Sequence, residues 1–195
     1  MKEDSGLTTL EVRFAGKGGQ GIVFSGLVLA RSAVIYEGKN ATSIQSYGSR
    51  MRGGSTVSDV IISDDEIICP VITEPDVLVA LAEEPLKEFS ANVKEDGFIL
   101  VDNAIKLSLK GNFKVFIIPA TQTAESDFGS RTPANVIMLG ALVGITDIVS
   151  EEAILTSLLD VMEELDLGEN VKKRNIHALI RGIELGRGLN QHKAD

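Results

Sequence analysis

The pattern of apolar and polar residues near the start of the chain predicts a strand, a tight turn and a helix in direct succession. Residues 10–14 alternate between apolar and charged side chains, which is typical of a half-buried strand. Four glycines follow within the six residues 16–21, and apolar residues then recur with helical spacing as far as about residue 37. Because glycine accepts positive φ and lets another group approach the backbone closely, this density predicts a constrained turn rather than a flexible linker. The N-terminus of the helix is then open to an anion or to the backbone of a partner.

Later segments predict that strands and helices alternate through the rest of the chain. Further strands are predicted at residues 41–46, 56–63, 76–81, 98–102 and 113–118. Further helices are predicted at residues 85–93, 134–145, 151–165 and 169–185. This alternation indicates an α/β protein that forms one domain over residues 1–195.

Three local signals refine this outline. Asp64 and Asp65 have the pattern of a turn that returns through residues 66–68, which predicts a local antiparallel pair and therefore a mixed sheet. The polar stretch 120–132 follows a buried strand and is predicted to be a functional loop. The Gly-Arg-Gly sequence at 186–188 is predicted to end the last helix.

The helix predicted at residues 134–145 is apolar on nearly all sides. Such a helix is buried all round in a folded protein. We therefore expect it to pack on the sheet with one side and on another chain with the other.

Composition narrows the classes of function. The chain has 19 Lys and Arg against 28 Asp and Glu, a formal charge of −9, which argues against nonspecific binding to nucleic acid or to a membrane surface. No apolar run approaches the roughly 18 residues of a membrane span, and residues 1–6 lack the apolar core of a signal peptide. We therefore expect the protein in the cytoplasm.

The chain offers few residues for catalysis or metal binding. Cys69 is the only cysteine, which excludes an internal disulfide, a Cys₄ zinc site and a self-ligated iron–sulfur cluster. Beside Pro70 at the end of an apolar strand, Cys69 is expected to be an inert hydrophobe, and His177 an ordinary helix residue. The sequence shows no nucleophile with a base and an acid, so we expect no catalytic or metal-binding residue of its own.

The glycine turn formally matches two nucleotide-binding motifs. Its Gly-x-Gly-x-x-Gly spacing fits the dinucleotide fingerprint, but residues 41–45 offer no acid for the ribose hydroxyls. Its length also fits a phosphate loop, but Ile22 and Val23 stand where Lys and Ser or Thr are required. Both motifs therefore lack an essential residue.

A second glycine-rich loop covers residues 47–55. Arg50 and Arg52 precede Gly53 and Gly54, and this combination suits a pocket for an anion, because guanidinium groups and glycine amides both bind anions. The alternative is that the arginines fix the loop to a neighbouring chain. The residues alone leave both interpretations open.

The two loops together resemble a known family. Residues 16–22 (Gly-Lys-Gly-Gly-Gln-Gly-Ile) and 45–55 (Gln-Ser-Tyr-Gly-Ser-Arg-Met-Arg-Gly-Gly-Ser) are similar to the gamma subunit of 2-oxoacid:ferredoxin oxidoreductases, and residues 60–63, 76–80 and 135–142 extend the likeness over nearly the whole chain. The second loop is closer to the 2-oxoglutarate and related 2-oxoacid branch than to the indolepyruvate branch.

The resemblance implies a three-layer α/β/α, Rossmann-like domain with a mixed, mainly parallel sheet. It implies a complex that decarboxylates a 2-oxoacid to an acyl-CoA and reduces ferredoxin. Thiamine diphosphate and [4Fe–4S] clusters belong to partner alpha, beta and delta subunits, and this chain contributes to assembly and to a surface that faces CoA. The residues expected at that surface are Gly16, Gly18, Gly19, Gln20 and Gly21 in the first loop and Tyr47, Arg50, Arg52, Gly53 and Gly54 in the second. Two other functions fit the same residues, a stand-alone nucleotide- or CoA-binding module and a pure assembly scaffold.

Overall fold

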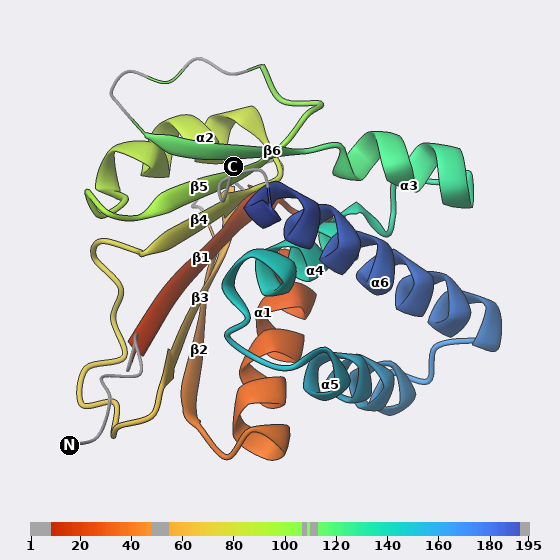
Figure 1. The fold of residues 1–195 in the computed structure, drawn as a ribbon, viewed down its shortest axis with the longest axis horizontal. Helices are drawn as coiled ribbons and strands as arrows, with labels where there is room; N and C mark the ends of the chain where they lie inside the picture. Colours follow the sequence, from red (N-terminus) through yellow and green to blue (C-terminus); the bar gives the residue numbers. More distant parts are fainter. Residues whose placement is uncertain (1–8, 48–54, 107–108, 110–112, 192–195) are drawn as a thin grey trace.

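The computed structural model describes residues 9–47, 55–106, 109 and 113–191. Six strands form one sheet in the order β2-β3-β1-β4-β5-β6, with helices on both faces (Figure 1). The strands are β1 (Thr9–Lys17), β2 (Asn40–Tyr47), β3 (Ser55–Ser63), β4 (Val77–Ala80), β5 (Phe98–Asp102) and β6 (Lys114–Ile118). This is the α/β architecture with a mixed, mainly parallel sheet that the sequence predicts.

Helices separate β1 from β2 and β4 from β5, whereas the last four helices follow one another, so the predicted alternation holds for only part of the chain. The helices are α1 (Ile22–Arg31), which continues as a π-helical turn η1 (Ser32–Tyr36), α2 (Glu83–Phe89), which continues as the 3₁₀ turn η2 (Ser90–Asn92), α3 (Ala120–Phe128), α4 (Ala134–Thr146), α5 (Glu151–Glu164) and α6 (Glu169–Gln191). None of the helices in the part of the chain that the structure describes is both long and apolar enough to cross a bilayer.

The sheet is mixed for a reason that differs from the prediction. β1, β4, β5 and β6 are parallel, whereas β3 is antiparallel to both β1 and β2. Residues 64–76 contain no strand, so the local hairpin predicted at Asp64 and Asp65 is wrong. β3 pairs instead with β1 along its whole length. β1 provides nine paired residues for β3, whereas residues 66–68 would provide only three.

The two faces of the sheet carry separate apolar clusters. Val12, Phe14 and Val79 face the cluster that α1, α4, α5 and α6 cover. Ala15 and Leu78 face the opposite cluster, which α2 covers. Helices thus lie on both faces, which is the three-layer arrangement shown in Figure 1.

The segment predicted as a functional loop at residues 120–132 is a helix over most of its length. Asp102, at the end of β5, accepts hydrogen bonds from the backbone N–H and the hydroxyl of Thr121 and so caps the start of α3. Ala120 and Ala124 are fully buried on one side of the helix. Gly129 then ends it with φ +65°. The polar composition of this segment did not indicate a helix, because the group that caps the start of α3 comes from Asp102 at the end of β5.

Helix α4 is buried on all sides, as predicted, but the same chain covers its outer side. α6 packs directly on α4 and continues past residues 186–188, which are helical and do not end it. The glycines serve close packing: a Cβ on Gly182 would lie 2.1 Å from the carbonyl oxygen of Ile137, and one on Gly186 would lie 2.3 Å from that of Ala141. Glycine in this helix therefore reflects backbone contact rather than a helix end.

The remaining predicted helices lie close to their predicted bounds. The α5 N-cap is confirmed, because the hydroxyl of Ser150 accepts the backbone N–H of Ala153 at 3.1 Å. Cys69 is exposed in a loop rather than at a strand end, so that part of its prediction is wrong.

Candidate functional site

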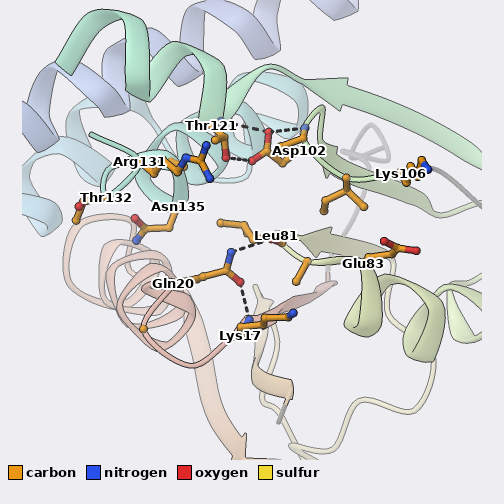
Figure 2. A pocket seen from close by; sticks show the side chains of 15 residues that line it. Lys17, Gln20, Leu81, Glu83, Asp102, Lys106, Thr121, Arg131, Thr132 and Asn135 are labelled. Atoms are coloured by element: carbon orange, nitrogen blue, oxygen red, sulfur yellow. Dashed lines mark hydrogen bonds between the residues drawn. The ribbon is translucent and has the colours of Figure 1, made fainter. Parts of the chain in front are cut away.

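A cavity of about 520 Å³ opens where the parallel strands end (Figure 2). It lies between the end of β1, which leads to α1 on one face of the sheet, and the end of β4, which leads to α2 on the other face. A crevice forms at such a point in open α/β sheets because consecutive connections leave in opposite directions, and ligands bind there.

The first glycine turn forms one wall of this cavity. Gly19 has φ +87° and Gly21 φ +71°, which are left-handed conformations that favour glycine. Gly21 is the N-cap of α1, and its carbonyl oxygen accepts the N–H of Ser25 at 3.0 Å. A Cβ on Gly21 would also lie 2.3 Å from Nδ2 of Asn135, the second residue of α4. The turn is therefore the constrained one that the sequence predicts.

Gln20 fixes this turn to the neighbouring strand. Its Oε1 accepts the backbone N–H of Lys17 at 2.6 Å, and its Nε2 donates to the carbonyl oxygen of Leu81 at 2.9 Å. The side chain thus joins the end of β1 to the end of β4, as the dashed lines in Figure 2 show. Gln20, predicted to contact a ligand, has both ends of its amide engaged in shaping the cavity.

Asp102 and Thr121 stand on the opposite wall, with Arg131 beside them (Figure 2). The Asp102 carboxylate is buried and accepts the N–H of Ala104 at 3.3 Å and that of Thr121 at 3.2 Å. The Arg131 side chain is exposed and forms an ion pair with Glu125, whose hydrogen bond raises the pKa of Arg131. The guanidinium is therefore a permanent positive charge at the mouth of the cavity.

The electrostatics of the cavity favour an anion. Helices α3 and α4 begin at its walls, where Thr121, Ala134 and Asn135 line it, whereas α1 begins behind the glycine turn. The positive ends of the helix dipoles attract negative charge. Lys17, Lys106 and Arg131 add cationic side chains, of which Lys17 forms an ion pair with Glu84 and Arg131 with Glu125. The carboxylates of Glu83 and Asp102 also line the cavity.

The structure brings the two predicted glycine loops to the same edge of the sheet. Gly16 pairs with Thr56 and Lys17 with Ser55, while Tyr47 pairs with Thr56 from the other side. The Ser55 end of the second loop therefore lies beside the first, and the Tyr47 end lies one strand further away, on β2. Arg50, Arg52, Gly53 and Gly54 lie outside the described residues.

The predicted residues divide into three groups by their place. Gly19 and Gln20 line the cavity, whereas Gly16, Gly18 and Gly21 shape the turn behind it. Tyr47 is exposed at the end of β2 and does not line the cavity.

Sequence reasoning missed several residues of the cavity. They are Lys17, Leu81, Asp102, Thr121, Arg131 and Asn135. Asp102 could have been predicted, because it ends a buried strand. The carboxyl ends of parallel strands meet at one edge of the sheet, where ligands bind. The predicted functional segment 120–132 contains Thr121 and Arg131, so the sequence indicated their region but not the residues themselves. Asn135 was not indicated as a site residue, and it reaches the cavity because the start of α4 packs against Gly21.

The arrangement can bind and orient an anionic ligand. Among the residues that the structure describes, no group of three or more His, Cys, Asp or Glu side chains is placed to hold a metal ion.

Comparison with known proteins identifies relatives over most of the chain. The family model "Pyruvate ferredoxin/flavodoxin oxidoreductase" matches residues 11–185. The 2-oxoglutarate synthase subunit KorC of Methanocaldococcus jannaschii is 35% identical, over 92% of this chain and 95% of the relative.

Two solved structures share the fold. The gamma subunit of a keto/oxoacid ferredoxin oxidoreductase from Geobacter sulfurreducens matches with a TM-score of 0.81 and 37% identity, over 93% of this chain and 98% of that one. The 2-oxoglutarate:ferredoxin oxidoreductase of Magnetococcus marinus, with 2-oxoglutarate, coenzyme A and succinyl-CoA bound, matches with a TM-score of 0.80 and 26% identity. That match covers 94% of this chain but only 32% of the other.

These relatives confirm the resemblance seen in the two glycine loops. The chain belongs to the pyruvate ferredoxin/flavodoxin oxidoreductase family.

Proposed function

We propose that this chain is the gamma subunit of a complex that oxidatively decarboxylates a 2-oxoacid to an acyl-CoA and reduces ferredoxin. In this proposal its cavity receives the phosphate-bearing part of CoA. The observation that carries the proposal is the convergence of the starts of α3 and α4 with Lys17, Lys106 and Arg131 around a cavity of about 520 Å³. Phosphate groups are the anions that such an arrangement suits. The coenzyme A bound in the Magnetococcus marinus enzyme supports this choice of ligand.

The second glycine loop is proposed to close the same site. Its Ser55 end is fixed beside Lys17 by the pairing of β3 with β1. Arg50 and Arg52, which lie in this loop of the sequence, are proposed to contact the ligand. Replacing Arg52 with alanine is expected to weaken CoA binding by the assembled complex.

The redox chemistry is proposed to belong to partner alpha, beta and delta subunits. A chain with one cysteine cannot ligate a [4Fe–4S] cluster by itself, because such a cluster is held by four thiolates. Thiamine diphosphate is likewise assigned to the partners. The chain described here then supplies one wall of the site where CoA meets the acyl group.

The 2-oxoacid is proposed to be 2-oxoglutarate or a related acid. The support comes from the KorC relative, a subunit of 2-oxoglutarate synthase that matches along nearly its whole length.

The direct test is isolation of the complex from the native cell through a tag on this chain. The copurifying chains are identified, and the complex and the isolated chain are assayed with CoA, ferredoxin and a panel of 2-oxoacids. We expect the complex to reduce ferredoxin fastest with 2-oxoglutarate and the isolated chain to be inactive. Oxidation of 2-oxoacids by the isolated chain would contradict the proposal.

A second candidate is a stand-alone nucleotide- or CoA-binding module. The observation that favours it is that the cavity and its glycine turn lie within one chain. A ligand at about 100 times its dissociation constant adds roughly 2.7 kcal/mol to the stability of the protein that binds it. A large thermal shift of the isolated chain with NAD or ATP would therefore favour this candidate over the complex subunit.

A further inference from the structure

The outward side of α1 and η1 is apolar although the structure leaves it uncovered. Leu27, Val34 and Ile35 are 42%, 43% and 59% exposed, and the half-buried Val23 lies one helical turn before Leu27. Their spacing places Val23, Leu27 and Val34 on one stripe of the helix. A surface helix normally carries polar residues on the side away from the core. This apolar stripe is therefore typical of a surface that another protein chain covers.

The strand beside this helix is an unprotected edge. β2 is the outermost strand, and no strand in the described ranges pairs with its outer side. Its eight residues, Asn40–Tyr47, include no charged side chain and no proline. Proteins usually protect a free edge with charges, proline or short length, because unpaired N–H and C=O groups recruit other strands. At the opposite edge, β6 is shorter and begins with Lys114.

The two features lie on neighbouring elements. α1 and η1 pack directly on β2, so the helix that carries the apolar stripe lies beside the edge strand (Figure 1). Charged groups border the stripe on the side of α5, where Arg31 forms ion pairs with Asp160 and Glu164. An apolar centre with a charged rim is the usual composition of a protein interface.

We infer that a separate partner subunit docks on this α1–β2 surface, laying apolar side chains on Leu27, Val34 and Ile35 and pairing an extended segment with β2. The inference rests on the proposed function and adds the location of the contact. The Magnetococcus marinus chain supports a larger partner subunit as the occupant, because the match to this chain covers only 32% of it. About two thirds of that chain is thus joined covalently to a unit like this one. Where the unit is a separate chain, the counterpart of those two thirds needs a docking surface to take the place of the covalent link.

The test uses the complex reconstituted by coexpression of this chain with its partner subunits. The variant carries Leu27→Glu and Val34→Glu together. The control carries Ile68→Glu and Val71→Glu, two exposed apolar positions in the loop between β3 and β4. Circular dichroism and thermal melting of each isolated chain verify that the fold is kept, as expected for changes at exposed positions.

We expect the variant to reduce copurification of the partner by about tenfold or more, while the control retains it. Deuterium exchange of the wild-type chain is expected to slow in residues 40–47 on assembly, because new backbone hydrogen bonds protect those amides. Normal copurification of a folded variant, or unchanged exchange in β2, would overturn the location of the contact and leave the proposed function standing.

Two other results are distinguishable. If the isolated wild-type chain dimerises in sedimentation measurements and the same variant abolishes the dimer, a second copy covers the surface and the inference is wrong. If the wild-type chain copurifies with no partner subunit, the proposed function itself fails.

Discussion

At the scale of single residues, the side chains that shape the cavity owe their roles to contacts distant in sequence. Gln20 lies in the turn where the sequence predicts a site, but its bond to Leu81 spans 61 residues. Asp102 likewise caps the start of α3 by accepting a hydrogen bond from Thr121, which lies 19 residues further along the chain. Periodicity and motif spacing describe neighbours along the chain, so they located the turn but could not assign these roles.

Replacing Gln20 with alanine is expected to destabilise the isolated chain by about 1–2 kcal/mol, because it removes one exposed and one partly buried hydrogen bond, each worth up to about 1 kcal/mol. The free energy of unfolding is measured by denaturant titration. Gln45→Ala, at an exposed position on β2, is the matched control and is expected to change little. Equal stability of the two variants would show that Gln20 does not hold the turn.

At the scale of elements, glycine was the residue whose meaning the sequence left most open. The glycines at 16–21 form a turn as predicted, whereas those at 182 and 186 lie inside α6 and pack on α4. Both patterns contain closely spaced glycines. A glycine near the end of a predicted helix can mark either the helix end or a close contact with another backbone. The position of α4 decides between the two, and that position depends on the tertiary fold.

Alanine at two neighbouring glycines of α6 is expected to act in opposite directions. A Cβ at Gly186 would lie 2.3 Å from the carbonyl oxygen of Ala141, whereas at Gly188 no atom lies within 4 Å. Gly186→Ala should therefore separate the helices and destabilise the fold by about 1–3 kcal/mol. Gly188→Ala should stabilise the helix by up to about 1 kcal/mol. Thermal melting of both variants measures the difference, and equal melting temperatures would contradict the packing role of Gly186.

The start of α5 is expected to contribute a pH-dependent part of the stability. Hydrogen bonds from the hydroxyl and the backbone N–H of Ser150 lower the pKa of Glu37 below its ordinary value, and the N–H lies 2.7 Å from Oε1. A lowered pKa in the folded state adds stability above the ordinary pKa, and this stability is lost as the pH falls through the folded pKa.

Glu37→Gln should thus be less stable than the wild type at about pH 7, and the difference should shrink on titration to about pH 3. Unfolding free energies of both proteins at several pH values measure this. A difference that stays constant across the range would show that the Glu37 charge contributes nothing.

At the scale of the whole molecule, the sequence predicted the elements better than their pairing. The sequence pattern located all six strands, of which five bury apolar residues and β2 buries none. It could not show that β3 returns beside β1, because pairing between distant strands is decided by the matching of whole apolar faces. The cavity depends on that arrangement, which brings both glycine loops to one edge. For the same reason, its cationic residues in the α3–α4 and β5–β6 connections, Arg131 and Lys106, were assigned to the cavity only in the structure.

The central claim is that this edge of the sheet binds CoA within the assembled complex. Isothermal titration of CoA into the complex tests it with the double variant Lys17→Ala and Arg131→Ala. Arg181→Ala, a half-exposed arginine on α6 outside the cavity, is the control. Loss of charge-assisted contacts worth about 1.5 kcal/mol or more should raise the dissociation constant for CoA by about tenfold or more in the double variant. The control should bind CoA as the wild type does, and the Michaelis constant for the 2-oxoacid should stay unchanged in both. Wild-type affinity for CoA in the folded and fully assembled double variant would contradict the claim.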